Sequence, residues 1–180
     1  MPDAAPAYTL TARVLHWITA ALVLTMIPIG IVMVNVEFEE EEVGDFLFHI
    51  HRSFGVVVLA IVAIRLTWRL THPPLPLPAD ISPLQRRAAR TVHWLLYALL
   101  LIQGLVGWIA TSAYRAPILV FWLFELPPIW PVDKDFSDKA FLVHQTIGIT
   151  IAVVLCIHIG AALHHHFIRR DRVLMRMVTG

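Results

Sequence analysis

Four long apolar segments restrict the possible folds of this chain more than any other feature. They cover residues 14–36, 46–66, 91–111 and 141–167, and a helix of about 20 residues is long enough to cross the hydrocarbon core of a bilayer. Hydrophobic residues make up 58% of the 180-residue chain, which is too apolar for a water-soluble domain. A helix satisfies its backbone polar groups internally, as lipid requires. The sequence therefore predicts one all-α domain over residues 1–180, an integral membrane four-helix bundle.

Three connections of different composition join these segments. Residues 37–45 contain six carboxylates and indicate a solvated loop. Residues 71–90 contain five prolines, which exclude a continuous helix and indicate a semi-rigid connection. Residues 112–139 are rich in tryptophan and proline, and their apolar part, 118–126, is too short to cross. We expect that part to lie at the membrane interface, where tryptophan is favoured.

Basic residues near the segment ends predict the orientation of the chain. With four crossings, ten arginines fall on one side, and four basic residues fall on the other side together with most of the acids. The first group is Arg13, Arg65, Arg69, Arg86, Arg87, Arg90, Arg169, Arg170, Arg172 and Arg176; the second is Arg52, Arg115, Lys134 and Lys139. The positive-inside rule then places both termini in the cytoplasm. The N-terminal residues lack a basic region and a cleavage site, so we expect the first segment to be retained.

Histidine is unusually abundant, with ten residues, several of them inside the apolar segments. His144 and His158 are 14 residues apart in the fourth segment, and a helix brings them to within about 40° of one face and about 21 Å apart along the axis. Ionisable residues in a spanning helix are costly and by default face the bundle interior. Antiparallel crossings put His16 at the depth of His158 and His51 at the depth of His144.

Two histidine pairs at two depths predict two b haems in the bundle core. Haem iron takes two axial ligands, and facing imidazoles in a helix bundle can hold a b-type haem without covalent attachment. The sequence contains no C-x-x-C-H, which excludes ordinary c-type attachment. The predicted haem-iron ligands are His16 with His158 and His51 with His144. A single membrane histidine is often only a structural donor, but four at paired depths favour ligation.

Glycine stands four residues after two of these histidines, in HRSFG from His51 and in HQTIG from His144. On a helix that position lies on the same face one turn away, and without a side chain it leaves room for the edge of a macrocycle. We therefore expect Gly55 and Gly148 to flank the periplasmic haem. The alternative is that they only permit close helix packing.

Five motifs together resemble the bacterial cytochrome b561 family, over about residues 10–177. They are VLHW around His16, HRSFG from His51, HWLLY from His93, HQTIG from His144 and HIGAALHHH from His158. The resemblance implies a multi-pass di-haem b cytochrome of the bacterial inner membrane with the same histidine pairing. It also implies electron transfer between a periplasmic donor and ubiquinone, and one activity known in the family is superoxide oxidase.

The same resemblance marks His93 and His165 as quinone-site residues on the cytoplasmic side, where each could hydrogen-bond a quinone carbonyl or relay its protons. No catalytic residue is expected beyond these cofactor-binding residues. The expected partners are membrane lipid, ubiquinone and a periplasmic electron donor, either superoxide or a redox protein, and no nucleic acid.

Three functions remain open at this point. The first is a superoxide:ubiquinone oxidoreductase or another quinone-linked oxidoreductase. The acidic segment 37–45 should repel the superoxide anion and suits a cationic donor better, such as a small basic cytochrome. The second is a cytochrome b anchor and electron conduit for a separate dehydrogenase that docks on residues 112–139. The third is a histidine-rich transporter of divalent metals.

Overall fold

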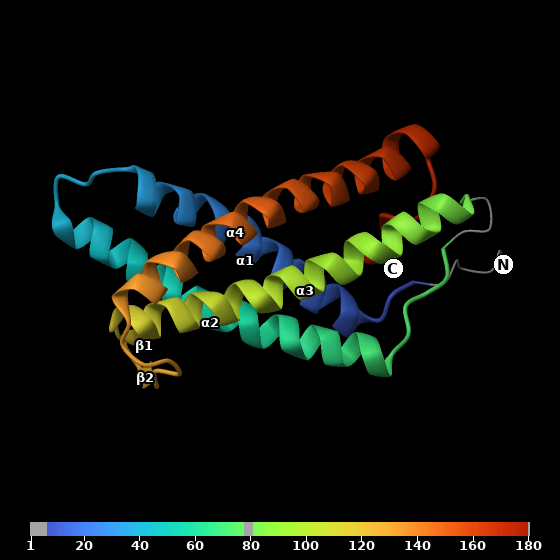
Figure 1. Cartoon of the computed structure of the whole chain (residues 1–180). Helices are drawn as coiled ribbons and strands as arrows, with labels where there is room; N and C mark the ends of the chain where they lie inside the picture. Colours follow the sequence, from blue (N-terminus) through green and yellow to red (C-terminus); the bar gives the residue numbers. More distant parts are fainter. Residues whose placement is uncertain (1–6, 78–80, 180) are drawn as a thin grey trace.

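The computed structural model describes residues 7–77 and 81–179, and it is mostly helical (Figure 1). Its four long helices are α1 (Leu10–Asn35), α2 (Glu41–Thr71), α3 (Pro83–Tyr114) and α4 (Lys134–Leu163). Each is long and apolar enough to cross a membrane. The smaller elements are the strands β1 (Ile118–Val120) and β2 (Phe124–Leu126), a π-helix (His164–Arg169) that prolongs α4, and α5 (Met175–Val178). The predicted all-α membrane fold with four helices is confirmed.

The helices extend beyond the apolar segments because polar residues stabilise their first turns. The acidic run, expected to be a loop as far as Asp45, is already helical from Glu41, since carboxylates in a first turn interact favourably with the helix dipole. At α3 the Oγ of Ser82 accepts from the Gln85 N–H (3.3 Å), and the Gln85 side chain accepts from the Ser82 N–H (3.2 Å). This capping box, with Pro83 at the first helical position, lets α3 begin inside the proline segment.

The helices pack around a core at the middle of the bundle. α3 packs along α4, α1 along α2, and α2 along α3. All four helices contribute to the central cluster, which consists of Val23, Val58, Val62, Tyr97 and Ile151. Large apolar side chains also cover the outside: Leu24 on α1 is 50% exposed and Val153 on α4 is 56% exposed. Such an outer surface would be unfavourable in water and fits contact with lipid.

The two ends of the described chain meet at one end of the bundle (Figure 1). The Tyr8 N–H donates to the Arg176 carbonyl (3.3 Å), and Trp17 Nε1 donates to the Met177 carbonyl (2.9 Å). Arg176 Nη1 donates to the carbonyl of Pro76, in the α2–α3 connection (2.8 Å). These bonds draw the start of α1, the α2–α3 connection and α5 together, so most of the predicted cytoplasmic arginines lie at this end.

At the opposite end, the apolar segment after α3 forms a hairpin over α2. β1 and β2 are antiparallel, with Ile118 opposite Leu126. The turn between them has positive φ at Phe121 (47°) and Trp122 (59°), the conformation of a type I′ turn that usually needs glycine or asparagine. Ser53 on α2 holds this turn, because its Oγ accepts from the Phe121 N–H (2.9 Å) and donates to the Leu119 carbonyl (3.1 Å).

Candidate functional site

The structure brings the four predicted ligand histidines together in the expected pairs. His16 on α1 faces His158 on α4, with 6.3 Å between the ring centroids and 60° between the ring planes. His51 on α2 faces His144 on α4, with 6.2 Å and 78°. α4 thus contributes one histidine to each pair.

The spacing within each pair fits one iron between two imidazoles. An imidazole nitrogen lies about 1 Å from the centre of its ring and binds a metal ion at about 2 Å, so two rings on opposite sides of one ion have centres roughly 6 Å apart. The observed 6.3 Å and 6.2 Å agree with that value. In addition, His51 Nδ1 is buried and has no hydrogen-bond partner among the described residues, so no bond to Nδ1 fixes the tautomer of this ring.

Two hydrogen bonds with α3 fix the tautomer of His144. Its Nδ1 lies 3.1 Å from the carbonyl oxygen of Gln103, which can only accept, and its Nε2 lies 3.1 Å from Nε2 of the Gln103 amide, which can only donate. The hydrogen of His144 is therefore on Nδ1 and the lone pair is on Nε2. This is the tautomer in which a histidine binds a metal through Nε2 while Nδ1–H donates to a carbonyl.

The glycines near the His51/His144 pair differ in the atoms that they contact. A Cβ built on Gly148 would lie 3.3 Å from the Gln103 amide nitrogen, whereas one on Gly55 would lie 3.9 Å from a methyl group of Met26. Two glycines that the sequence analysis did not assign to the site lie closer to the imidazoles. These are Gly30 on α1, beside His51, and Gly107 on α3, beside His144.

The His16/His158 pair has a guanidinium and a third histidine beside it. Arg65 Nη2 donates to His16 Nδ1 (2.7 Å), and the guanidinium also lies over the ring of Tyr97 at 5.3 Å. The His93 ring centroid is 5.3 Å from that of His158. The structure thus places the predicted quinone-site residue His93 directly beside this pair.

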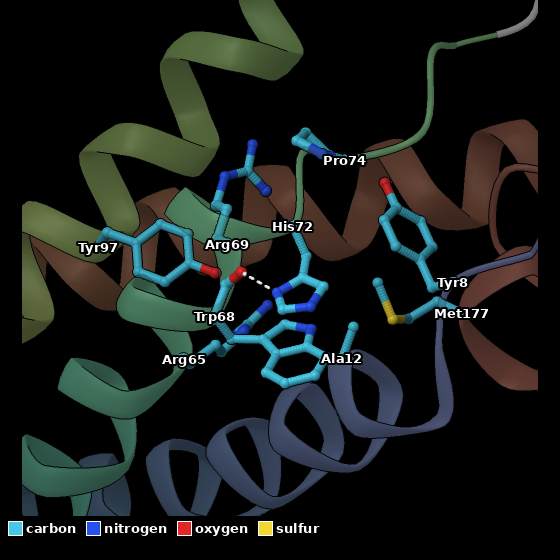
Figure 2. A pocket seen from close by; sticks show the side chains of 9 residues that line it. All are labelled: Tyr8, Ala12, Arg65, Trp68, Arg69, His72, Pro74, Tyr97 and Met177. Atoms are coloured by element: carbon cyan, nitrogen blue, oxygen red, sulfur yellow. Dashed lines mark hydrogen bonds between the residues drawn. The ribbon is translucent and has the colours of Figure 1, made fainter.

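Arg65 also reaches a small cavity at the end of the bundle where the chain ends meet (Figure 2). The cavity has a volume of about 50 Å³, and Tyr8, Arg65, Trp68, Arg69 and Tyr97 are among the residues that line it. Burial raises the pKa of Tyr8, although Arg69 and Arg176 lower it, so the phenol stays neutral. Pockets for drug-sized ligands and cofactors measure about 300–1,000 Å³, so this cavity fits water and not a quinone ring.

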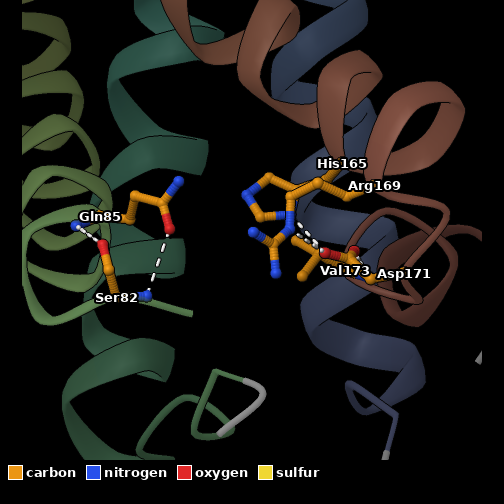
Figure 3. A network of polar contacts seen from close by, with 6 residues as sticks. All are labelled: Ser82, Gln85, His165, Arg169, Asp171 and Val173. Carbon is orange, nitrogen blue, oxygen red and sulfur yellow. Dashed lines mark hydrogen bonds and ion pairs between the residues drawn. The ribbon is translucent and has the colours of Figure 1, made fainter. Parts of the chain in front are cut away.

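His165 lies beyond the end of α4, in the π-helix, and is paired with a carboxylate (Figure 3). Its Nδ1 is 2.5 Å from Asp171 Oδ2, and Arg169 Nε is 3.3 Å from the same oxygen. Burial acts to raise the pKa of Asp171, but hydrogen bonds from His165, from the Val173 N–H and from Arg169 outweigh it and hold the pKa below its usual value. Asp171 is therefore ionised at neutral pH. His93 thus lies beside an imidazole, whereas His165 lies beside a carboxylate.

Two other arginines near the helix ends bond to main-chain carbonyls. Arg13 donates to the Val178 carbonyl (2.7 Å), and Arg52 donates to the Pro117 carbonyl (2.8 Å). Within residues 7–77 and 81–179, no group of three or more histidine, cysteine, aspartate or glutamate side chains could hold a metal ion. The histidines near the core form facing pairs, an arrangement that fits haem.

A family model described as prokaryotic cytochrome b561 matches residues 7–180. This chain belongs to the prokaryotic cytochrome b561 family. It is 33% identical over 176 residues to cytochrome b561 homolog 2 of Escherichia coli, covering 95% of this chain and 90% of the relative. It is 26% identical over 165 residues to a probable superoxide oxidase, CybB, of Yersinia pestis, covering 91% of each chain. Cytochrome b561 homolog 1 of Escherichia coli is 28% identical over 172 residues.

Membership of the cytochrome b561 family defines the general function. The chain is a multi-pass membrane protein that transfers electrons, and its cofactor is b-type haem. The facing histidines are the residues of the described chain that fit this cofactor best.

Proposed function

We propose that this cytochrome binds two b haems, one between His51 and His144 and one between His16 and His158, and that it passes electrons across the bacterial inner membrane between a periplasmic donor and ubiquinone. The observation that carries the proposal is the pair of facing imidazoles at each of two depths. When bound, each haem supplies an iron that gains or loses one electron. Gly55 and Gly148 are proposed to flank the haem at the His51/His144 level.

The histidines determine which chemistry is possible at each level. Two imidazoles that both held one iron would favour electron transfer over oxygen binding at this site. At His144 the hydrogen bond from Nδ1 to the Gln103 carbonyl (3.1 Å) orients the ring and makes Nε2 a stronger ligand. His51 lacks such a bond to its Nδ1 among the described residues, so the two ligands of one site differ in strength.

Arg65 is proposed to bind a haem carboxylate at the other level. Its guanidinium can only donate, so His16 Nδ1 accepts in the contact at 2.7 Å. A histidine that binds iron through Nε2 carries its hydrogen on Nδ1, and Arg65 would then need another acceptor. A carboxylate is the strongest acceptor for a guanidinium. Arg13 and Arg52, by contrast, already donate to main-chain carbonyls.

Ubiquinone is proposed to be reduced near His93 and His165, at the end of the bundle where the chain ends meet. Two electrons and two protons convert the quinone to quinol, and His93, beside His158 at 5.3 Å, would hydrogen-bond a quinone carbonyl. Asp171 holds the Nδ1 of His165, which leaves Nε2 to exchange protons with the quinone and the cytoplasm. This arrangement resembles a histidine oriented by a carboxylate in general acid–base catalysis.

The charge distribution supports an orientation with the chain ends and the proposed quinone site on the cytoplasmic side. The end that carries most of the arginines also holds the start of α1 and α5, so the positive-inside rule places it in the cytoplasm. The other end carries the exposed carboxylates of residues 37–45. The similarity to a probable superoxide oxidase supports superoxide as donor, in which case one quinone, two superoxide ions and two protons give one quinol and two O₂. The acidic surface instead favours a cationic redox protein.

The haem assignment is tested by haem content. We expect purified His144→Ala to lose the haem at the His51/His144 level and His158→Ala to lose the other, with the remaining haem still reducible by dithionite. His49→Ala is the matched control, because His49 packs on Trp122, with ring centroids 5.7 Å apart, outside both pairs. Full haem content in both ligand variants would refute the pairing.

A second candidate function is that of a membrane anchor and electron conduit for a separate dehydrogenase. It is favoured by the exposed apolar surface of the loop after α3, where Leu123 is 81% and Trp122 is 55% exposed. A groove of about 320 Å³, lined by Arg115, Trp130 and several prolines, lies beside the hairpin. Both features suit a docked protein partner.

Superoxide and ubiquinone added to the isolated protein distinguish the two functions. A self-sufficient oxidoreductase reduces its haem with superoxide and forms quinol faster than the uncatalysed background. A rate equal to the background would favour the docked conduit.

A further inference from the structure

The imidazoles of His51 and His144 lie against glycines of neighbouring helices. A Cβ built on Gly107 of α3 would lie 2.8 Å from Cε1 and 3.1 Å from Nδ1 of His144. A Cβ on Gly30 of α1 would lie 3.2 Å from Cε1 of His51. Carbon atoms attract one another best at about 3.5–4.0 Å, so a side chain at position 107 would displace the ring, and one at position 30 would press on it.

Among the described glycines, only Gly30 and Gly107 have an imidazole as the nearest group to such a Cβ, and both imidazoles belong to the His51/His144 pair. The glycines on the ligands' own helices do not touch an imidazole in this way: the atom nearest to a Cβ on Gly55 belongs to Met26 (3.9 Å), and the atom nearest to one on Gly148 belongs to Gln103 (3.3 Å). On α4, a Cβ on Gly160, close to His158, would meet nothing within 4 Å. Close glycine–imidazole contact is thus a property of the His51/His144 level.

Gly107 also explains how His144 reaches a main-chain carbonyl. In a helix each Cα–Cβ bond tilts toward the N-terminus, so a side chain covers the turn before its own residue. The side chain at position 107 would therefore cover the carbonyl of residue 103. Because position 107 is glycine, the Gln103 carbonyl is open to the side and accepts the Nδ1–H of His144 at 3.1 Å.

We propose that Gly30 and Gly107 are positioning residues for the haem at the His51/His144 level: each seats one imidazole, and Gly107 also exposes the Gln103 carbonyl that orients His144. The inference rests on the proposed ligation by His51 and His144. Gly30 and Gly107 lie on α1 and α3, the helices that flank the two ligands. The glycines of the H-x-x-x-G motifs lie instead on α2 and α4, the helices that carry the ligands.

The test is Gly107→Ala in the full-length haem-loaded protein, with Gly104→Ala and Gly160→Ala as controls. Gly104 is on the same helix, and its added methyl group would meet the Leu59 side chain at 3.1 Å, so it reproduces helix crowding without touching a histidine. Gly160→Ala reproduces the gain in helix propensity in open space. The readouts are haem content, the midpoint potential of each haem and the electron paramagnetic resonance spectrum of the oxidised protein.

We expect Gly107→Ala to lose the haem at the His51/His144 level or to shift its resonance and potential, while the His16/His158 haem and both controls stay as in the wild type. Wild-type haem content and spectra in Gly107→Ala, or the same change in Gly104→Ala, would overturn the inference. If Gly107→Ala binds neither haem, the milder Gly30→Ala decides: a shifted spectrum of the same haem supports the inference, and an unchanged one overturns it.

The proposed ligation can fail separately from this inference. If His144→Ala keeps both haems, the ligation itself is wrong, whatever the glycine variants show. If His144→Ala loses a haem and the glycine variants leave that haem unchanged, only the positioning role is wrong.

Discussion

His144 and His51 occupy equivalent places in one pair but have different hydrogen bonds. Both nitrogens of His144 are bonded to Gln103, whereas the buried Nδ1 of His51 has no partner within the described residues. Hydrogen bonding to the distal nitrogen of a histidine ligand raises its basicity and stabilises the oxidised metal. At the scale of single residues, the strength of each histidine ligand therefore depends on the hydrogen bonds of its imidazole.

Asp171 makes a prediction for the C-terminal turn. Asp171→Asn removes the carboxylate that contacts His165 and Arg169, so we expect faster hydrogen exchange in residues 171–179. The folded pKa of Asp171 is lowered, so its stabilisation is complete above the unfolded value of about 3.9 and is lost as pH falls through the lower folded pKa. Wild-type protection should stay constant between about pH 5 and pH 8 and fall only in strong acid.

The control for this prediction is Asp138→Asn. Its carboxylate pairs with Lys134 at 3.3 Å, with both side chains largely exposed, and such surface pairs contribute little to stability. Equal exchange in wild type and Asp171→Asn would show that the carboxylate does not hold the turn.

At the scale of elements, the hairpin after α3 depends on α2 more than on its own sequence. Its type I′ turn places bulky residues at positions that favour glycine. The Phe121 ring packs edge-on against Phe54, with centroids 5.1 Å apart, and the Trp122 ring stacks on Phe46 at 6.1 Å. These aromatic contacts and the two Ser53 bonds hold the strained turn against α2.

Ser53→Ala tests this dependence. Ser53 is 1% exposed, and its loss leaves the Phe121 N–H and the Leu119 carbonyl without their hydroxyl partner. Leaving buried polar groups unpaired costs about 1–3 kcal/mol, which we expect as a lower free energy of unfolding of the purified protein. Thr67→Ala is the control, because the Thr67 hydroxyl bonds only back to the Ala63 carbonyl of its own helix at 3.0 Å among the bonds described. Equal stability of the two variants would contradict the proposed anchoring of the hairpin.

At the scale of the whole molecule, the orientation in the membrane can be measured by cysteine labelling. Cys156 is the only cysteine of the sequence, so Cys156→Ser gives a background without thiols. In intact cells we expect an impermeant maleimide to label Glu40→Cys, in the acidic connection, and to label Arg87→Cys only after the membrane is opened. The opposite pattern would reverse the proposed topology and place the quinone site in the periplasm.

The pairing of histidines by depth could be predicted because it depends on quantities that sequence order determines. The helix rise places His144 and His158 at two different levels on α4, and alternating crossings assign His51 and His16 to those levels. The structure brings these pairs to 6.2 Å and 6.3 Å. The four apolar helices were predictable for the same reason, since lipid allows few other backbone arrangements.

The contacts between helices could not be predicted in this way. A motif such as H-x-x-x-G shows which residues share a face of one helix, but it does not show which neighbour that face meets. Gly30 and Gly107 contact the imidazoles across helix boundaries, and Asp171 meets His165 only because a π-helix and a left-handed Arg170 (φ 57°) turn the chain back.

The sequence alone therefore determined the membrane fold and the relative depth of the four paired histidines, because hydrophobic length and helix rise act along the chain, and its histidine motifs indicated the family. The tertiary structure decided which side chains hold each imidazole, because helix rotation and packing depend on all four helices at once.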